Sequence, residues 1–270
     1  MNGHLFQVGV GSGGIVALDL LARDPRITRV TLVEPDVYKA HNVHRHLFPP
    51  SSVGRLKIDL TKEWLLAIRP ELVVESFAID LCDPAKQDTI REAIATCDVG
   101  VCAADNEPAK YHFDHLMRAA HKNWTLGEVL SGGIGGWVHA FAPDGPCYGC
   151  IASFLKREGP NDGPPAPPPD YANPHGPAET SIPAGKASIA AIAALHALRT
   201  LELLSGPPEF SSLLLTLARV PDVFDEPYRT HRFRIPKSPE CLLCSADPAT
   251  AAGEDLDAAL DRVLARLAHE

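Results

Sequence analysis

A glycine-rich loop near the start of the sequence constrains the fold more than any other feature. Residues 7–21 read QVGVGSGGIVALDLL, so an apolar, strand-like run enters three glycines with the spacing G-x-G-x-x-G and continues into a helical pattern. Such glycines allow a tight turn and let the backbone approach a phosphate, and the following helix offers unpaired N–H groups. The loop therefore predicts a β-turn-α unit that binds a nucleotide, with expected contacts at Gly9, Gly11, Ser12, Gly13 and Gly14.

Strand-like and helical segments alternate through the first half of the chain. We expect strands at 5–10, 29–34, 72–79 and 98–104 and helices at 13–22, 55–68, 84–95 and 108–121. This alternation predicts an α/β fold with a Rossmann-like, mostly parallel sheet and helices on both faces. Ligands of such sheets bind at the carboxyl ends of the strands.

The pattern changes after Trp124, where strand-like runs follow one another with only glycine turns between them. This change predicts an antiparallel extension of the sheet, which makes the chain a single domain with a nucleotide-binding half and an extension that carries a metal site. The segment 158–185 is crowded with proline, and we expect it to be flexible, as a solvated insertion rather than a lid. The domain covers residues 1–270, with the nucleotide-binding half at 1–125 and the extension at 126–270. In this second part we expect strands at 124–130, 135–143, 211–220 and 228–235 and helices at 186–204 and 256–267.

Composition excludes several classes of function. The formal net charge of -9 over 270 residues argues against broad binding to nucleic acid, which requires surplus Lys and Arg. The sequence has no apolar run long enough to cross a membrane and no signal-peptide pattern at its start. We therefore expect a cytoplasmic protein without a membrane or nucleic-acid partner.

Four of the seven cysteines form two C-x-x-C pairs, Cys147 with Cys150 and Cys241 with Cys244. Two such pairs suit a tetrahedral metal better than a disulfide framework, and four thiolates make a closed, structural Zn²⁺ site. Cys97 and Cys102 flank the core of a predicted buried strand, and we expect both thiols to pack in the core.

Polar residues at the ends of the predicted strands indicate which nucleotide chemistry the loop serves. Glu34 ends the second strand, where an acidic side chain accepts hydrogen bonds from ribose hydroxyls. Asn42, Arg45 and Lys57 follow it, and Asp105 comes after the fourth strand. Cations stabilise the negative charge of a reacting triphosphate and a carboxylate suits Mg²⁺. Taken singly, the cations are better explained as solvated charges and Asp105 as a helix N-cap. Taken together, and in this order, the residues favour attack on a triphosphate.

In combination, these motifs resemble those of the ThiF/MoeB adenylyltransferases, whose fold is shared with ubiquitin-activating enzymes. The resemblance covers nearly the whole chain. The matching elements are the glycine loop, Glu34-Pro-Asp36, Asn42-x-x-Arg45, Gly54-x-x-Lys57, Asp105-Asn106, and the two cysteine pairs beginning at Cys147 and Cys241.

The resemblance implies ATP-dependent adenylation of a carboxylate, usually the C-terminal glycine of a ubiquitin-like or sulfur-carrier protein, with release of pyrophosphate. By position, Glu34 would hold the ribose, Arg45 and Lys57 would bind the phosphates, Asn42 would orient them and Asp105 would bind Mg²⁺. The motifs add Asp36 and Asn106 as two further contacts to the cofactor. The resemblance also favours a homodimer with two active sites.

Some features depart from the family pattern. No cysteine lies between Cys150 and Cys241, which predicts an adenylate product without a thioester on this chain. Lys110 stands where the family has Arg, and His46 replaces a usual Gln. The sequence begins almost at the first strand, without the family's arginine-bearing helix, and this motivates one alternative, a catalytically weak scaffold for a ubiquitin-like partner.

Further alternatives are an NAD-dependent oxidoreductase and adenylation of a carboxylate on a peptide or an RNA. Two histidine features are interpreted without a metal. His196 reads as a hydrogen-bonded histidine of the core or its edge, and the cluster of residues 41–46 lacks the spacing of a metal site.

Overall fold

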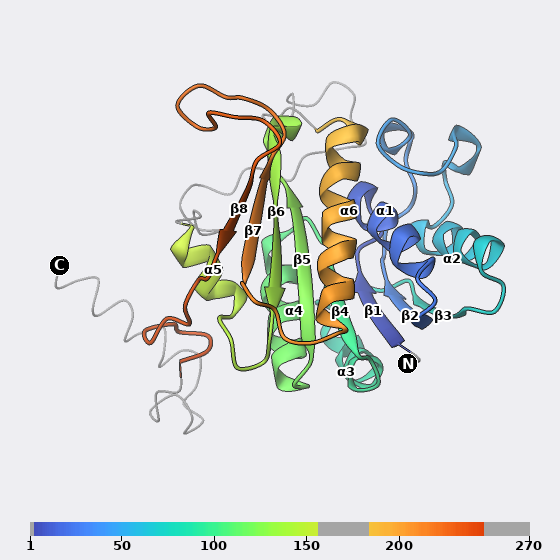
Figure 1. Ribbon diagram of the computed structural model, residues 1–270. Helices are drawn as coiled ribbons and strands as arrows, with labels where there is room; N and C mark the ends of the chain where they lie inside the picture. The colour runs from blue at the N-terminus through green and yellow to red at the C-terminus, as the bar shows by residue number, and fades with distance from the viewer. Residues whose placement is uncertain (1–2, 156–183, 246–270) are drawn as a thin grey trace.

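A single eight-stranded sheet organises the protein, with the order β3-β2-β1-β4-β5-β6-β7-β8 (Figure 1). The computed structural model describes residues 3–155 and 184–245. Strands β1 to β5 are mutually parallel, and β6, β7 and β8 extend the sheet in antiparallel fashion, as the sequence predicts. The strands are β1 Gly3–Val8, β2 Ile27–Val33, β3 Val73–Phe77, β4 Val99–Cys102, β5 Asn123–Val129, β6 Gly135–Phe141, β7 Ser212–Thr216 and β8 Thr230–Phe233.

Helices cover both faces of the sheet, so the prediction of a Rossmann-like α/β fold with an antiparallel extension is confirmed. Side chains of α1, α2 and α6 pack in one apolar cluster with β1 and β2, and those of α3, α4 and α5 pack in a second cluster on the opposite face. The helices are α1 Ser12–Ala22, α2 Lys57–Ile68, α3 Gln87–Ala95, α4 Glu107–Ala119, α5 Tyr148–Phe154 and α6 Lys186–Leu203, with 3-10 turns at Ala40–Asn42, Pro50–Ser52, Pro84–Lys86 and Ser131–Gly133.

Some predicted boundaries shift in the structure. The strand expected at 211–220 ends at Thr216, because the chain then leaves the ladder for a loop in which Asp222 and Tyr228 have positive φ. The helix expected from residue 84 begins as a 3-10 turn, with Asp83 accepting a hydrogen bond from the Ala85 N–H. The predicted helix at 256–267 and most of the proline-rich segment 158–185 lie outside the described residues, and the division of the domain at residue 125 stays a prediction.

The strand order reverses at β1, which pairs with β2 on one side and β4 on the other. The chain leaves β1 toward β2 on one side of the sheet centre, and it leaves β4 toward β5 on the other side. Because these connections run in opposite directions, a crevice opens at the carboxyl ends of β1 and β4. Every residue of β1 is buried, so this strand forms the centre of the sheet beneath the crevice.

Two cysteines line the core as expected. Cys97 and Cys102 are fully buried, and burial raises the pKa of each thiol to about 12. Both therefore remain protonated at neutral pH and act as small apolar side chains.

The largest buried aromatic group joins the parallel and antiparallel parts of the sheet. Trp124 stacks on Phe141, with ring centroids 3.9 Å apart, and meets the edge of Phe113 at 5.2 Å. We expect Trp124→Ala to lower the free energy of unfolding by about 3 to 5 kcal/mol, because it leaves a cavity in the core. Urea denaturation measures the loss. Val73→Ala, on the exposed edge strand β3, serves as the control and should change it by under about 1 kcal/mol; equal effects would contradict this role of Trp124.

Candidate active site

The glycine loop owes its shape to two of its glycines and its open surface to a third. Gly9 has φ +85°, and a Cβ there would lie 2.6 Å from the Ala103 carbonyl oxygen. A Cβ on Gly14 would lie 2.4 Å from the Gly9 oxygen. At Gly11 no atom lies within 4 Å of the Cβ position, so the loop leaves space there for a bound group.

Hydrogen bonds with three buried side chains fix the backbone of the loop. The Gln7 amide donates hydrogen bonds to the carbonyl oxygens of Gly9 and Gly14, each at 2.9 Å. The peptide group of Val10 is fixed at both ends, because its N–H donates to Glu34 Oε2 at 2.8 Å and its oxygen lies 2.9 Å from His46 Nε2. Burial lowers the pKa of His46 to about 4, so its ring is neutral and donates to the Val10 oxygen. Sequence reasoning missed Gln7 and His46, since neither residue type signals a role in the loop.

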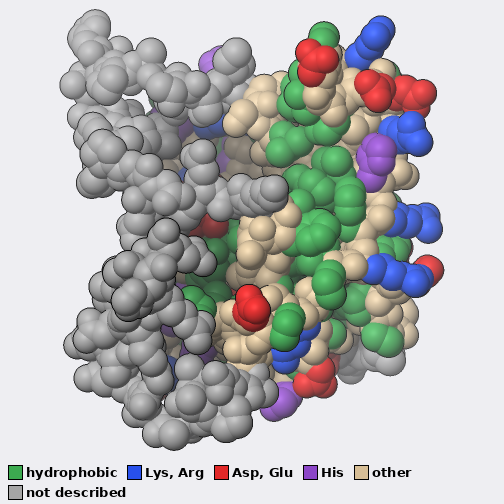
Figure 2. Space-filling model, turned by 90° about the vertical axis from the view of Figure 1, so that its left-hand side faces the viewer, with side chains coloured by type: hydrophobic (Ala, Val, Ile, Leu, Met, Phe, Trp, Pro, Cys, Tyr) green, Lys and Arg blue, Asp and Glu red, His purple; other side chains and the backbone are tan. Residues whose placement is uncertain are grey.

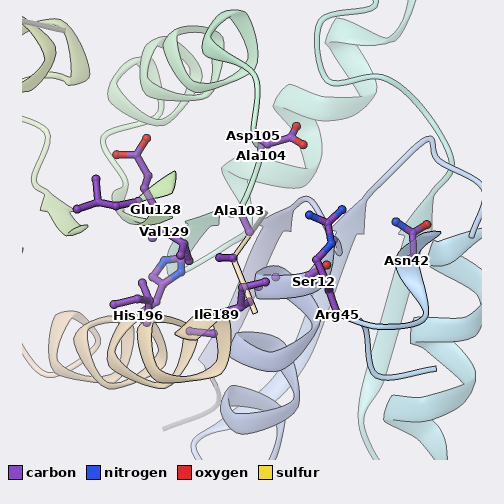
Figure 3. A pocket seen from close by; sticks show the side chains of 18 of the residues that line it. Ser12, Asn42, Arg45, Ala103, Ala104, Asp105, Glu128, Val129, Ile189 and His196 are labelled. Atoms are coloured by element: carbon purple, nitrogen blue, oxygen red, sulfur yellow. The ribbon is translucent and has the colours of Figure 1, made fainter. Parts of the chain in front are cut away.

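A cavity of about 530 Å³ opens above the loop, between the amino ends of α1 and α6 and the carboxyl ends of β4 and β5 (Figure 3). Both helices begin at a glycine without a side-chain cap, Gly11 for α1 and Gly185 for α6. Their first N–H groups and positive dipole ends favour an anion in the space between them.

Eight predicted site residues line this cavity, and four do not. The wall contains a guanidinium, an ammonium and a carboxylate together with the backbone of the loop. The eight lining residues are Gly11, Ser12, Gly13, Gly14, Asn42, Arg45, Lys57 and Asp105, and the four that do not line the cavity are Gly9, Glu34, Asp36 and Asn106. The structure brings the predicted set together, while the binding role of each residue stays a prediction.

The charged side chains of the cavity fall into two kinds. Lys57 is buried and its ammonium lies 2.6 Å from Asp36 Oδ2, so Asp36 serves to hold the lysine. By contrast, the side chains of Arg45 and Asp105 make no hydrogen bond or ion pair within the described ranges 3–155 and 184–245. A cation and a carboxylate that no described residue engages are therefore available to a ligand in the same cavity.

Two asparagines act on the backbone. Asn106 is the N-cap of α4, and its side chain accepts a hydrogen bond from the Ala109 N–H at 2.9 Å. The predicted alternative, with Asp105 as the helix cap, is therefore wrong, and the neighbouring asparagine leaves that carboxylate free. Asn42 is buried and its Oδ1 accepts a hydrogen bond from the Lys39 N–H at 2.8 Å.

Lys110, which stands where the family has Arg, is committed to two carboxylates. Its Nζ lies 2.7 Å from Glu107 Oε1 and 2.8 Å from Glu128 Oε1. Burial alone would lower the pKa of Lys110, but the two carboxylates together raise it, so the lysine is charged. Glu128 lines the same cavity and also lies 3.4 Å from His139 Nε2. On this side of the cavity, Lys110 is therefore paired with Glu107 and Glu128 and is not available as a cation for a ligand.

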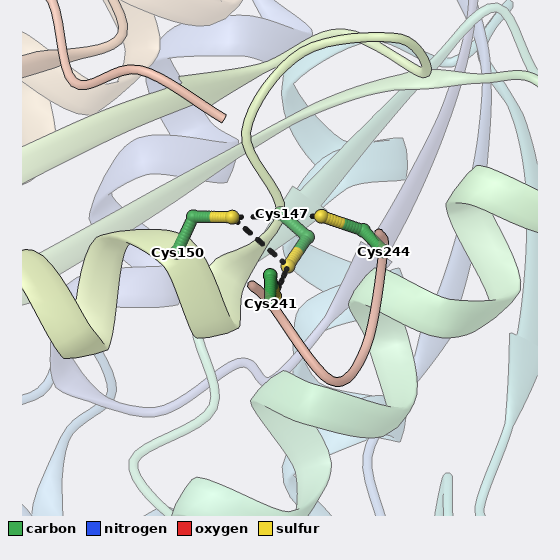
Figure 4. A group of neighbouring side chains, drawn as sticks. All are labelled: Cys147, Cys150, Cys241 and Cys244. Carbon is green, nitrogen blue, oxygen red and sulfur yellow. Dashed lines mark hydrogen bonds between the residues drawn. The ribbon is translucent and has the colours of Figure 1, made fainter. Parts of the chain in front are cut away.

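The four cysteines of the two C-x-x-C pairs meet at one point, away from the cavity (Figure 4). Their sulfur atoms all lie within 4.8 Å of one another, with Cys147 Sγ 3.7 Å from Cys150 Sγ and 3.4 Å from Cys241 Sγ. Four thiolates around a tetrahedral Zn²⁺, each at about 2.3 Å, lie about 3.8 Å apart. The cluster therefore fits zinc, and four protein ligands leave no open position for a substrate.

The fold and the cavity define an α/β protein of the kind that binds nucleotides at a glycine loop. A model of the ThiF family matches residues 2–243, and the chain belongs to this family. No helix in the described part of the chain is long and apolar enough to cross a membrane.

Relatives with curated names include ubiquitin-like modifier-activating enzyme 5 of Arabidopsis thaliana, 26% identical over 175 residues, which cover 56% of this chain and 40% of that protein. The SAMP-activating enzyme E1 of Haloferax volcanii is 25% identical over 152 residues, or 56% of this chain and 54% of that protein. The adenylyltransferase and sulfurtransferase UBA4 of Scheffersomyces stipitis is 24% identical over 151 residues, 56% of this chain and 33% of that protein. The chain thus spans about half or less of the length of these relatives.

Solved structures of similar fold include MccB of E. coli, with a TM-score of 0.68 and 19% identity, covering 91% of this chain and 66% of MccB. A complex of MccB with AMPCPP and MccA gives a TM-score of 0.65 at 19% identity and covers 90% of this chain and 67% of that one. At this identity the likeness concerns the fold.

The glycine contacts predict opposite results for two substitutions of the same size. Gly14→Ala forces a Cβ against the Gly9 oxygen and should lower the free energy of unfolding by about 1 to 3 kcal/mol. Gly11→Ala places its Cβ in open space and should change it by under about 1 kcal/mol. Chemical denaturation of both variants measures the difference, and the reverse order of stability would show that the loop has another shape.

We expect the purified protein to carry about one zinc ion per chain, bound by the four cysteines. Cys147→Ser and Cys244→Ser should lose the metal and melt at a lower temperature, because a closed metal site contributes directly to folding. Elemental analysis and thermal melts under reducing conditions measure both effects, with Cys82→Ser, outside the cluster, as the control. A fully folded, metal-free wild-type protein would refute the assignment.

Proposed function

We propose that the protein uses ATP and Mg²⁺ to adenylate the C-terminal carboxylate of a ubiquitin-like or sulfur-carrier protein. The observation that carries this proposal is that Arg45 and Asp105, whose side chains no described residue engages, meet the open glycine loop in one cavity. An NAD-dependent oxidoreductase would leave this cation and this carboxylate without a task.

The reaction follows from what the cavity offers to each part of the triphosphate. Phosphate groups over the loop receive N–H groups of α1, and Arg45 and Lys57 stabilise the negative charge that develops at the α-phosphorus. A carboxylate oxygen of the substrate attacks this phosphorus and forms the new O–P bond. The bond from the α-phosphorus to the bridging oxygen breaks, and pyrophosphate leaves with the electron pair. The attacking carboxylate is already ionised, so no protein base is needed.

Asp105 is the residue of the described cavity wall that fits a Mg²⁺ ion. Its carboxylate is exposed to the cavity, and Mg²⁺ prefers one or two carboxylates together with phosphate and water. Bound there, the ion would neutralise phosphate charge.

The names of the relatives support the choice of substrate. One relative is named as activating SAMP and another as an adenylyltransferase, and MccB has been crystallised with AMPCPP and MccA. The chain has no cysteine from residue 151 to residue 240, so we propose that the acyl-adenylate is its product, without a thioester. A cytoplasmic location stays a prediction.

A homodimer also stays a prediction. The surface seen from the β8 side shows hydrophobic side chains gathered between charged ones (Figure 2). An apolar surface of this kind is typical of contacts between proteins, and it suits either a second copy or a carrier protein.

Removal of either uncommitted charge should abolish most of the activity. We expect Arg45→Ala and Asp105→Asn each to reduce carrier-dependent exchange of labelled pyrophosphate into ATP by about 10² to 10³-fold, because each group acts on charge that develops in the transition state. Arg23→Ala, which removes an exposed arginine paired with Asp19 on α1, should leave exchange unchanged.

Equal activity of the wild type and both cavity variants would overturn the proposal. Binding of ATP and a carrier by the wild type without any pyrophosphate exchange would instead support the scaffold alternative. The assay therefore separates an enzyme from a binding protein of the same fold.

A further inference from the structure

His196 belongs both to the core and to the wall of the cavity. It projects from α6 toward β5, on the opposite side of Ala103 from Arg45 and Asn42 (Figure 3). Its side chain is only 3% exposed, and its Nε2 lies 2.9 Å from Thr125 Oγ1. The sequence interpretation of a hydrogen-bonded core histidine agrees with this contact but does not account for its place in the cavity wall.

The contacts of His196 fix which of its nitrogens carries the proton. Thr125 Oγ1 lies 2.7 Å from Thr200 Oγ1, and the Thr200 hydroxyl donates to the His196 carbonyl oxygen at 3.0 Å. That carbonyl oxygen can only accept, so the Thr200 hydroxyl donates its one hydrogen to it. Thr200 Oγ1 therefore accepts the hydrogen bond from the Thr125 hydroxyl. Thr125 in turn accepts from Nε2–H. One order of donors satisfies all three contacts, and it leaves Nδ1 with a lone pair.

Nδ1 of His196 has no hydrogen-bond partner in the described part of the chain. A Cβ at Gly127 would lie only 2.5 Å from this nitrogen, so the absence of a side chain at this position is what allows the ring to pack against β5. Burial lowers the pKa of His196 to about 4, with a smaller contribution from His139, and the ring is therefore neutral at physiological pH. The cavity wall thus presents a hydrogen-bond acceptor together with the apolar residues Ile192 and Ala193 of the same helix.

The chemistry of a neutral acceptor limits its ligand. Phosphate oxygens are acceptors themselves, and the glycine loop, Arg45 and Lys57 already serve them. A metal at His196 is not indicated, because no group of three or more potential metal ligands among the described residues includes this histidine. A ligand for Nδ1 must donate a hydrogen. The nucleotide can donate from its ribose hydroxyls and its adenine amino group, and a protein tail that ends in glycine can donate from its peptide N–H groups. The place of His196 beside apolar residues, on the opposite side of Ala103 from Arg45, favours the tail.

We infer that His196 Nδ1 accepts a hydrogen bond from a peptide N–H of the substrate's carboxyl-terminal tail, which makes His196 a residue that binds and positions the acyl substrate. This inference rests on the proposed function. The hydrogen bond holds the tail at the end of the cavity opposite Arg45, and the Thr125–Thr200 pair keeps the ring in the accepting tautomer.

The direct test uses the wild-type protein and synthetic hexapeptides that end in two glycines. In four peptides, each of the last four peptide nitrogens is methylated in turn, and calorimetry measures their binding to the protein saturated with AMPCPP and Mg²⁺. We expect one of the methylated peptides to bind about tenfold more weakly than the parent peptide, since it lacks the donated hydrogen. Equal binding of all five peptides, or no binding of the parent peptide, would overturn the inference.

Two variants distinguish the role of Nδ1 from the role of Nε2, because each retains a polar atom near only one of the two nitrogens. His196→Gln places its amide near Nε2 and keeps the donor to Thr125, but it removes the acceptor at Nδ1. His196→Asn places its amide oxygen near Nδ1 and loses the bond to Thr125. The glutamine variant should bind the parent peptide about tenfold more weakly and no longer discriminate against the sensitive methylated peptide, whereas the asparagine variant should still discriminate.

The affinity for AMPCPP should be the same in the wild type and in His196→Gln. A loss of nucleotide binding without a loss of peptide binding would assign Nδ1 to the nucleotide and overturn the inference. Pyrophosphate exchange with the parent peptide tests the proposed function separately, because peptide binding that depends on His196 without exchange would contradict adenylation alone.

Discussion

The fixed peptide group of Val10 is the contact on which the site depends. Its N–H is held by Glu34 and its oxygen by His46, and both of these side chains are almost fully buried. A buried carboxylate is stable only where donors satisfy it, and Glu34 also accepts from the Asp36 N–H at 3.0 Å. The bond from the Val10 N–H therefore both stabilises the acid and fixes the loop. A rigid loop keeps the first N–H groups of α1 directed at the cavity before any ligand arrives.

Around this loop, the protein divides its charges between structure and ligand. Lys57 and Lys110 are buried and paired with carboxylates, whereas Arg45 and Asp105 are held in the cavity without a described partner. A fully buried cation without a partner would be costly, whereas the partly exposed Arg45 can be solvated where no ligand is bound. The two lysines thus have fixed positions, and the arginine and the aspartate respond to the ligand.

The sequence could predict those features that follow from spacing along the chain. The glycine loop, the alternation of strands and helices and the meeting of Cys147 with Cys241 all belong to this kind. It could not show that Asn106 rather than Asp105 caps α4, because either residue suits the position and only the direction of the side chains decides. The sequence also could not show that His196 lines a cavity. The place of this ring depends on its contact with Gly127, which is 69 positions away in the chain and adjacent only in the folded protein.

The cysteine cluster lies outside the cavity, yet a chain of contacts joins the two. Tyr148, which follows Cys147, donates from its hydroxyl to Glu107 Oε2 at 2.8 Å, and Glu107 in turn pairs with Lys110. The cluster ties two chain segments 94 residues apart, and a metal that closes so long a loop restricts the unfolded chain strongly. A zinc ion in the cluster would therefore stabilise the antiparallel extension and, through α5, fix the acidic pair around Lys110 that forms one wall of the cavity. In this arrangement a metal with no catalytic position still affects the shape of the site.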